Sequence, residues 1–122
     1  MGGAMRSKRR WLLVLAGRLD QAGLDELRGR LELRRMGRLT DREDAHLGTR
    51  EIPGGLVLDL WRDEDKQDDW SINLDVDSGV DVPDEVLAQW RVRAEAAATA
   101  VGLTVVEFRS FPAPAREDHQ TT

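Results

Sequence analysis

The side chains that most often carry catalysis are scarce in this sequence. Its 122 residues include no cysteine, no tyrosine and only two histidines, His46 and His119. General acid–base and nucleophilic catalysis use a His, Cys, Lys or Tyr held beside a partner group. Asp44 is close to His46 in the sequence, but no serine or threonine is placed as its nucleophile, so we interpret His46 as a surface residue. We therefore expect no enzyme, unless a site is built between subunits or from carboxylates and arginines alone.

Acidic residues recur at spacings that resemble the start of a calcium-binding loop. Such a loop needs glycine at its sixth position and a bidentate glutamate at its twelfth. The run that begins at Asp63 has Asp68 and Leu74 at these positions. The run that begins at Asp75 has Val86 at its twelfth position. Glycine-rich loops that follow a strand and open a helix, the usual phosphate sites, are missing too. We expect no metal site and no cofactor.

Strict alternation of apolar and polar residues over 70–77 is typical of a half-buried strand with one wet face. Asp20 is placed to cap a helix, and Pro83 with the two acidic residues after it is typical of a helix start. Thr40 and Glu43 have the spacing of a capping box. The other elements that we expect are a strand at 9–17, a helix at 20–36, a short helix at 41–47, a strand at 56–62, a helix at 83–101 and a strand at 103–111.

This order, β-α-β-β-α-β, predicts an α+β protein with a ferredoxin-like fold. Such a fold has a four-stranded antiparallel sheet, with the first and third strands central and both helices on one face. We expect a single domain over residues 9–111, between disordered tails at 1–8 and 112–122. The fold accommodates enzymes, RNA binders, metal carriers and ligand sensors, so it does not decide the function.

The predicted elements also divide the tryptophans and the arginines between core and surface. Trp11, Trp70 and Trp90 fall on apolar faces and should pack in the core, whereas Trp61 is in phase with Asp59 and should reach the open sheet face or its rim. The arginines of the first helix lie outside its apolar stripe and should be largely solvated; they are Arg28, Arg30, Arg34 and Arg35.

Absence of cysteine in so small a chain favours a reducing cytoplasm, because small secreted domains usually depend on disulfides. The apolar run at 11–16 follows four basic residues, but it is too short for a signal peptide or a membrane span. We therefore expect a cytoplasmic protein without a membrane association.

Charge is distributed unevenly along the chain, whose net charge is −5. Residues 1–50 hold 12 Lys/Arg against seven Asp/Glu, and residues 51–122 hold six against 16. Such asymmetry is typical of a surface built for a charged partner, although two oppositely charged faces of one fold would give the same pattern. The acidic side chains of the second and third strands should share the open face of the sheet with Trp61. We expect the partner-binding residues to be Asp59, Trp61, Asp63, Asp65, Asp69, Asn73, Asp75 and Asp77.

The function that we expect is a non-enzymatic interaction or regulatory protein that binds a basic protein through this acidic face. An immunity protein or inhibitor of a basic nuclease is one concrete version. The alternatives are a small-ligand sensor that dimerises, or a nucleic-acid-binding protein, which the acidic face disfavours because it repels phosphate. A homodimer is compatible with each of these functions.

Overall fold

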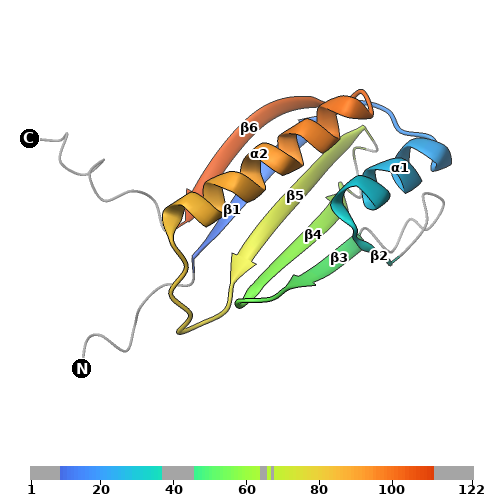
Figure 1. Ribbon diagram of the computed structural model, residues 1–122. Coiled ribbons are helices and arrows are strands. Elements are labelled where there is room, and N and C mark those ends of the chain that lie inside the picture. The colour runs from blue at the N-terminus through green and yellow to red at the C-terminus, as the bar shows by residue number, and fades with distance from the viewer. Residues whose placement is uncertain (1–8, 37–45, 64–65, 67, 112–122) are drawn as a thin grey trace, which may run out of the picture.

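Six strands and two helices form the part of the chain that the computed structural model describes, namely residues 9–36, 46–63, 66 and 68–111. The strands make one sheet in the order β2-β3-β4-β5-β1-β6, and every neighbouring pair is antiparallel. Both helices cover the same face of this sheet (Figure 1). The elements are β1 (Arg10–Ala16), α1 (Gln21–Leu31), β2 (Arg34–Arg35), β3 (His46–Ile52), β4 (Leu56–Arg62), β5 (Asp69–Val76), α2 (Asp84–Ala100) and β6 (Thr104–Phe111).

The prediction of a four-stranded ferredoxin-like sheet was wrong, although the protein is α+β. All four expected strands form, but β2 and β3 extend the sheet beyond β4. The cause is the segment 53–55, Pro-Gly-Gly, which turns the chain back so that Ile52 faces Leu56 across a β3–β4 hairpin. Gly54 and Gly55 have φ of +103° and +93°, a conformation that glycine adopts without steric cost. The expected helix at 41–47 lies outside the described residues except for its last two, which begin β3.

The core lies between the helices and the face of the sheet that they cover. Alternate residues of β1, β4 and β5 point into it, as the period-two pattern predicts. The indole N–H of Trp11 donates to the Leu87 carbonyl and that of Trp70 to the Gly17 carbonyl, so both polar atoms of these buried rings are satisfied. Trp90 is only half-buried, because it packs at the edge of the core between two guanidinium groups, Arg50 at 5.1 Å and Arg93 at 4.8 Å from its ring centre.

Helix α1 begins where the sequence predicts and ends earlier. The Asp20 carboxylate accepts a hydrogen bond from the Gly23 N–H at 2.8 Å, which confirms the expected N-cap. The helix stops at Leu31 instead of Met36, because Glu32 adopts the left-handed conformation with φ 56° and ψ 44°. Residues 34–35 then pair with β3.

Helix α2 agrees with its prediction at both ends. Pro83 precedes its first turn, where Asp84 and Glu85 complement the positive end of the helix dipole. Gly102 follows the last turn with φ +91°. Among the described residues, neither helix combines the length and the hydropathy that crossing a bilayer requires. The expected tails, 1–8 and 112–122, lie outside the described residues.

Candidate interaction surface

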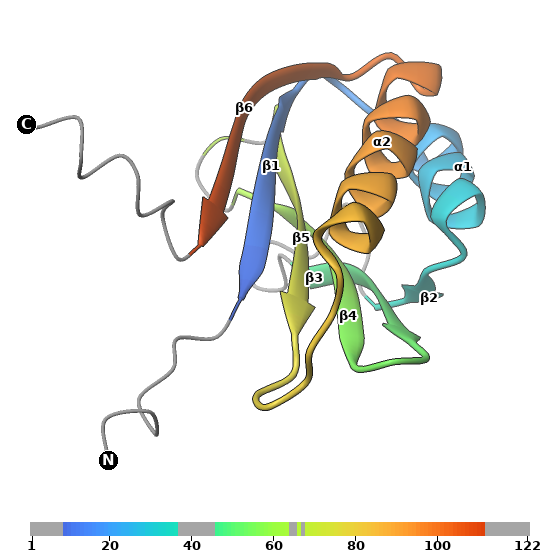
Figure 2. The ribbon, with the colours of Figure 1, turned by 60° about the vertical axis from the view of Figure 1, so that its left-hand side comes forward.

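The sheet has one face that neither α1 nor α2 covers (Figure 2), which we call the far face. It brings together residues from the predicted site. Asp59 of β4 lies directly opposite Asn73 of β5, and Trp61 lies opposite Ser71. Directly opposite residues and alternate residues of one strand share a face, so five of the eight predicted residues lie on this face of two adjacent strands: Asp59, Trp61, Asp69, Asn73 and Asp75. The far face consists of Arg10, Leu12, Val14 and Ala16 of β1, Arg34 of β2, His46, Thr49 and Glu51 of β3, Val57, Asp59 and Trp61 of β4, Asp69, Ser71, Asn73 and Asp75 of β5, and Thr104, Glu107, Arg109 and Phe111 of β6.

His46, Asp59 and Trp61 form the most organised group on this face. The His46 ring stacks on the Trp61 indole with 4.2 Å between ring centres and 14° between planes. His46 Nε2 lies 2.8 Å from Asp59 Oδ1, so imidazole and carboxylate are hydrogen-bonded. The Asp59 side chain is only 14 % exposed, whereas Trp61 is 38 % exposed. A partly desolvated carboxylate therefore adjoins an accessible aromatic ring whose orientation is fixed by its stacking partner.

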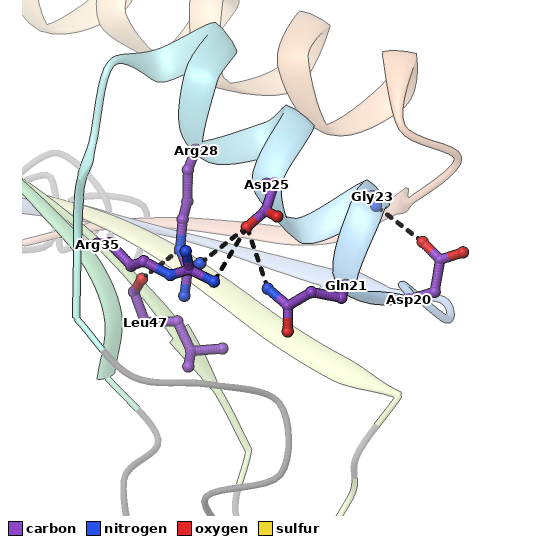
Figure 3. A network of polar contacts seen from close by, with 7 residues as sticks. All are labelled: Asp20, Gln21, Gly23, Asp25, Arg28, Arg35 and Leu47. Carbon is purple, nitrogen blue, oxygen red and sulfur yellow. Dashed lines mark hydrogen bonds and ion pairs between the residues drawn. The ribbon is translucent and has the colours of Figure 1, made fainter.

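A buried arginine in α1 positions the strand that carries His46. Arg28 Nε donates to the carbonyl oxygen of Leu47 at 2.7 Å, and its Nη1 donates to Asp25 at 3.2 Å (Figure 3). Asp25 also accepts a hydrogen bond from Gln21 and lies 3.6 Å from Arg35 Nη2. Arg28 is 4 % exposed, so the expectation that it is solvated was wrong. Its guanidinium group thereby links α1 to Leu47, the second residue of β3.

Electrostatics at Arg28 agree with this buried position. Desolvation lowers the pKa of the Arg28 guanidinium from its usual value, and the positive charge of Arg35 lowers it further. The carboxylate of Asp25 opposes both effects through its charge and its hydrogen bond. Asp25 thus compensates part of the cost of burying a cation at the junction of α1 and β3.

Asp75 and Asp69 lie towards the two ends of β5 on the far face, and the remaining predicted site residues lie beyond the strands or outside the described residues. Asp75 accepts a hydrogen bond from the Asn73 side chain at 2.9 Å and faces Arg10 across the β1–β5 pair. Asp63 and Asp69 lie at the ends of the β4 and β5 strands, joined by a backbone hydrogen bond, at the hairpin tip. Asp77 follows β5 in an exposed turn, so its expected place on the strand was wrong. Asp65 lies outside the described residues.

Charge on the far face is divided between two regions. Carboxylates without a guanidinium group beside them on the same face of the strand occur on β3, β4 and β5, namely Glu51, Asp59, Asp69 and Asp75, whereas guanidinium groups occur on β1, β2 and β6, namely Arg10, Arg34 and Arg109, the last of them with Glu107. Arg109 donates to Glu107 two residues away, and this hydrogen bond lowers the pKa of the Glu107 carboxyl and raises that of Arg109. Arg10 lies over the Phe111 ring, 5.0 Å from its centre. The acidic region is therefore the β4–β5 half of the face.

The role of His46 is the feature that sequence reasoning missed. The sequence analysis paired His46 with its sequence neighbour Asp44. In the structure its contacts are Asp59 and Trp61, which follow it by 13 and 15 positions. The signal was available at 53–55, since a three-residue glycine-containing connection between two extended segments is typical of a hairpin. Interpreted that way, the turn predicts β3 and places His46 across from Trp61.

The described part of the chain holds no group of side chains suited to metal binding. No cluster of three or more His, Cys, Asp or Glu side chains that could hold a metal ion occurs among the described residues. The His46–Asp59 pair has the elements of a proton-transfer dyad, and its neighbours in the sheet register are Trp61, Thr49 and Asn73.

Comparison with known protein families, with curated proteins and with solved structures finds no match for this chain.

Proposed function

We propose that this protein is a non-enzymatic interaction protein that binds a basic protein partner through the β4–β5 half of its far face. The observation that carries the proposal is the Trp61 ring, held against His46 beside the Asp59 carboxylate. Tryptophan is enriched among the residues that dominate binding energy at protein interfaces. A ring that is already oriented loses less conformational entropy when a partner covers it.

The chemistry around Trp61 favours a cationic partner. Asp59 and Asp75 lie diagonally across β4 and β5, and Asp63 and Asp69 extend the negative charge towards the hairpin tip. A guanidinium or ammonium group could lie over the accessible indole face and pair with a neighbouring carboxylate. Complementary charge also accelerates association and disfavours wrong partners. An inhibitor or immunity protein for a basic enzyme is one function of this kind.

Affinity capture with matched variants tests the proposal. The bait is the full chain, and the far-face variants are Trp61→Ala and the pair Asp59→Asn with Asp75→Asn. A control pair, Glu26→Gln with Glu85→Gln, removes the same charge from exposed positions on the two helices. Proteins captured from the native host are identified by mass spectrometry and then purified, and their dissociation constants are measured.

We expect a basic protein that both far-face variants bind at least tenfold more weakly and that the helix control binds like the wild type. Its affinity should also fall with increasing salt, since exposed charges are screened. Asn retains the shape of Asp and can still hydrogen-bond to His46. The free energy of unfolding of the double variant should therefore be within about 1 kcal/mol of the wild-type value. A partner that binds the far-face variants as tightly as the wild type would refute the proposal.

A further inference from the structure

Strand β6 forms one edge of the sheet and is long for an exposed edge. It spans eight residues and pairs with β1 on one side, and no other strand of the described residues pairs with its outer side. The opposite edge, β2, has only two residues. Long edges with unpaired N–H and C=O groups are templates for strand addition, and proteins usually shorten them or place charges there. The backbone on the outer side of β6 is therefore a candidate surface for strand addition, distinct from the β4–β5 half of the far face.

The charges of β6 are self-complementary. Glu107 and Arg109 face Val14 and Leu12 in the β1–β6 register, so both side chains lie on the far-face side of the strand. Between them, Phe108 faces Leu13 on the helix side. If a second β6 pairs antiparallel about Phe108, Glu107 of each copy lies opposite Arg109 of the other. Opposite charges directly across an antiparallel pair are stabilising.

Other antiparallel registers of two β6 strands are less favourable. A pairing centred on Glu107 sets two carboxylates directly opposite each other, and one centred on Arg109 sets two guanidinium groups opposite each other, which is destabilising. A shift by a single residue would place the side chains of the two copies on opposite faces. The register centred on Phe108 is the one near the strand centre that pairs unlike charges.

Packing around Phe108 keeps this edge rigid. The centres of the Phe108 and Trp11 rings are 6.0 Å apart, and the guanidinium of Arg91 lies 3.6 Å from the centre of the Phe108 ring. Phe108 therefore packs β6 against both β1 and α2. The neighbouring Val106 is 61 % exposed, one of three large apolar side chains that are exposed among the described residues. Its position at the β1–β6 irregularity leaves an apolar side chain at the edge for a second strand to cover.

We propose that two copies of this chain associate through their β6 strands, antiparallel about Phe108, to form a continuous sheet across a two-fold axis. Each copy contributes one Glu107 and one Arg109 to two reciprocal ion pairs, as an isologous interface requires, and these pairs extend the Arg109–Glu107 contact within each strand. The contact covers the sheet edge and leaves the β4–β5 half of the far face of each copy accessible. The proposal is thus independent of the function proposed above.

Charge reversal tests both the contact and its register. Sedimentation or light scattering of the wild type over roughly 1–100 µM should show a concentration-dependent dimer, a range in which weak specific association is detected. Glu107→Arg places four guanidinium groups together, and Arg109→Glu places four carboxylates together. Each single variant should dimerise about tenfold more weakly or worse.

Restoration of complementary charge separates this interface from any other. An equimolar mixture of Glu107→Arg and Arg109→Glu should form a heterodimer, and the double exchange Glu107→Arg with Arg109→Glu should dimerise like the wild type. Circular dichroism verifies that each variant is folded. The proposal is overturned if the wild type stays monomeric at about 100 µM, if the single variants dimerise normally, or if the mixture does not associate. Normal dimers of the single variants would show a different interface.

Discussion

Trp61 and Trp70 stand on paired strands, yet their indole rings meet opposite surroundings. Trp70 points to the helices, is 2 % exposed and donates to the Gly17 carbonyl. Trp61 points to the far face and is 38 % exposed. The difference follows from the strand period of two, which the sequence displays clearly in both strands. Their alternation made the positions of these two residues predictable without a structure.

Truncation of the two rings should therefore have unequal effects on folding. Trp70→Ala should lower the free energy of unfolding by about 3–5 kcal/mol, because it leaves a cavity and an unused carbonyl acceptor. Trp61→Ala should lower it by about 1 kcal/mol or less, because it removes a partly exposed ring stacked on His46. Urea unfolding monitored by circular dichroism measures both. Similar losses for the two variants would show that Trp61 is a structural residue, and the proposed interface would lose its anchor.

Arg28 shows where reasoning from residue type fails at this scale. Arginine outside an apolar stripe is normally solvated, but the helix brings Arg28 against β3, a strand that local patterning did not predict. Its guanidinium satisfies the Leu47 carbonyl, and its stem fills space that an apolar residue would otherwise occupy. A buried polar contact of this kind depends on a partner 19 residues away, which propensity and periodicity do not reveal.

Arg28→Ala should lower the free energy of unfolding by about 2 kcal/mol, because the Leu47 carbonyl loses the shorter of its two hydrogen bonds, the other being from the Met36 N–H, and Asp25 loses its nearest cation. The matched control is Arg30→Ala on the same helix, where an exposed arginine pairs with Glu26 and the expected loss is about 0.5 kcal/mol. Chemical denaturation measures the free energy of unfolding of both variants and of the wild type. Equal and small losses would contradict the structural role assigned to Arg28.

Elements with strong periodicity or strong end signals were predictable, and the others were not. Helix α2 and strand β5 agree with expectation because end signals, dipole charges and alternation all favour the same structure. Strand β3 has a glycine and several polar residues within seven positions, so its pattern is weak. It forms because the 53–55 turn folds it onto β4, and because Arg28 and Leu33 pack against it. Tertiary contacts outweigh intrinsic preference there.

Two glycines give a test of element stability with opposite signs. Gly29 lies in α1, and a Cβ added there would have no neighbour within 4 Å, so Gly29→Ala should raise the free energy of unfolding by about 0.5–1 kcal/mol. Gly55 has φ +93° and its added carbon would lie 2.8 Å from Val80, so Gly55→Ala should lower it by about 1–3 kcal/mol. Thermal unfolding resolves both changes as shifts of a few degrees. Destabilisation by Gly29→Ala would contradict the helix boundaries.

At the scale of the whole molecule, the sheet has one face for the core, one face for the proposed partner and one long edge for the proposed second copy. The charge asymmetry of the sequence predicts an acidic surface in the second half of the chain, and β4 and β5 carry it. The expected central position of the first and third strands agrees with the observed order β4-β5-β1-β6, but β2 and β3 beyond β4 were not predicted. Sequence reasoning therefore could not place Arg34 and Glu51 on the far face, since their positions depend on this long-range pairing.

Photo-crosslinking in the native host tests the proposed interface most directly. A benzophenone amino acid is introduced at Ser71, which lies opposite Trp61 on the far face, and, as the control, at Ala96, an exposed position on α2. We expect irradiation to crosslink the Ser71 variant to a basic protein. High salt should reduce the yield of this crosslinked product, and the Ala96 variant should give none of it. Crosslinking of partners from Ala96 alone, or of the same partner with equal yield from both positions, would contradict the assignment of the far face as the binding surface.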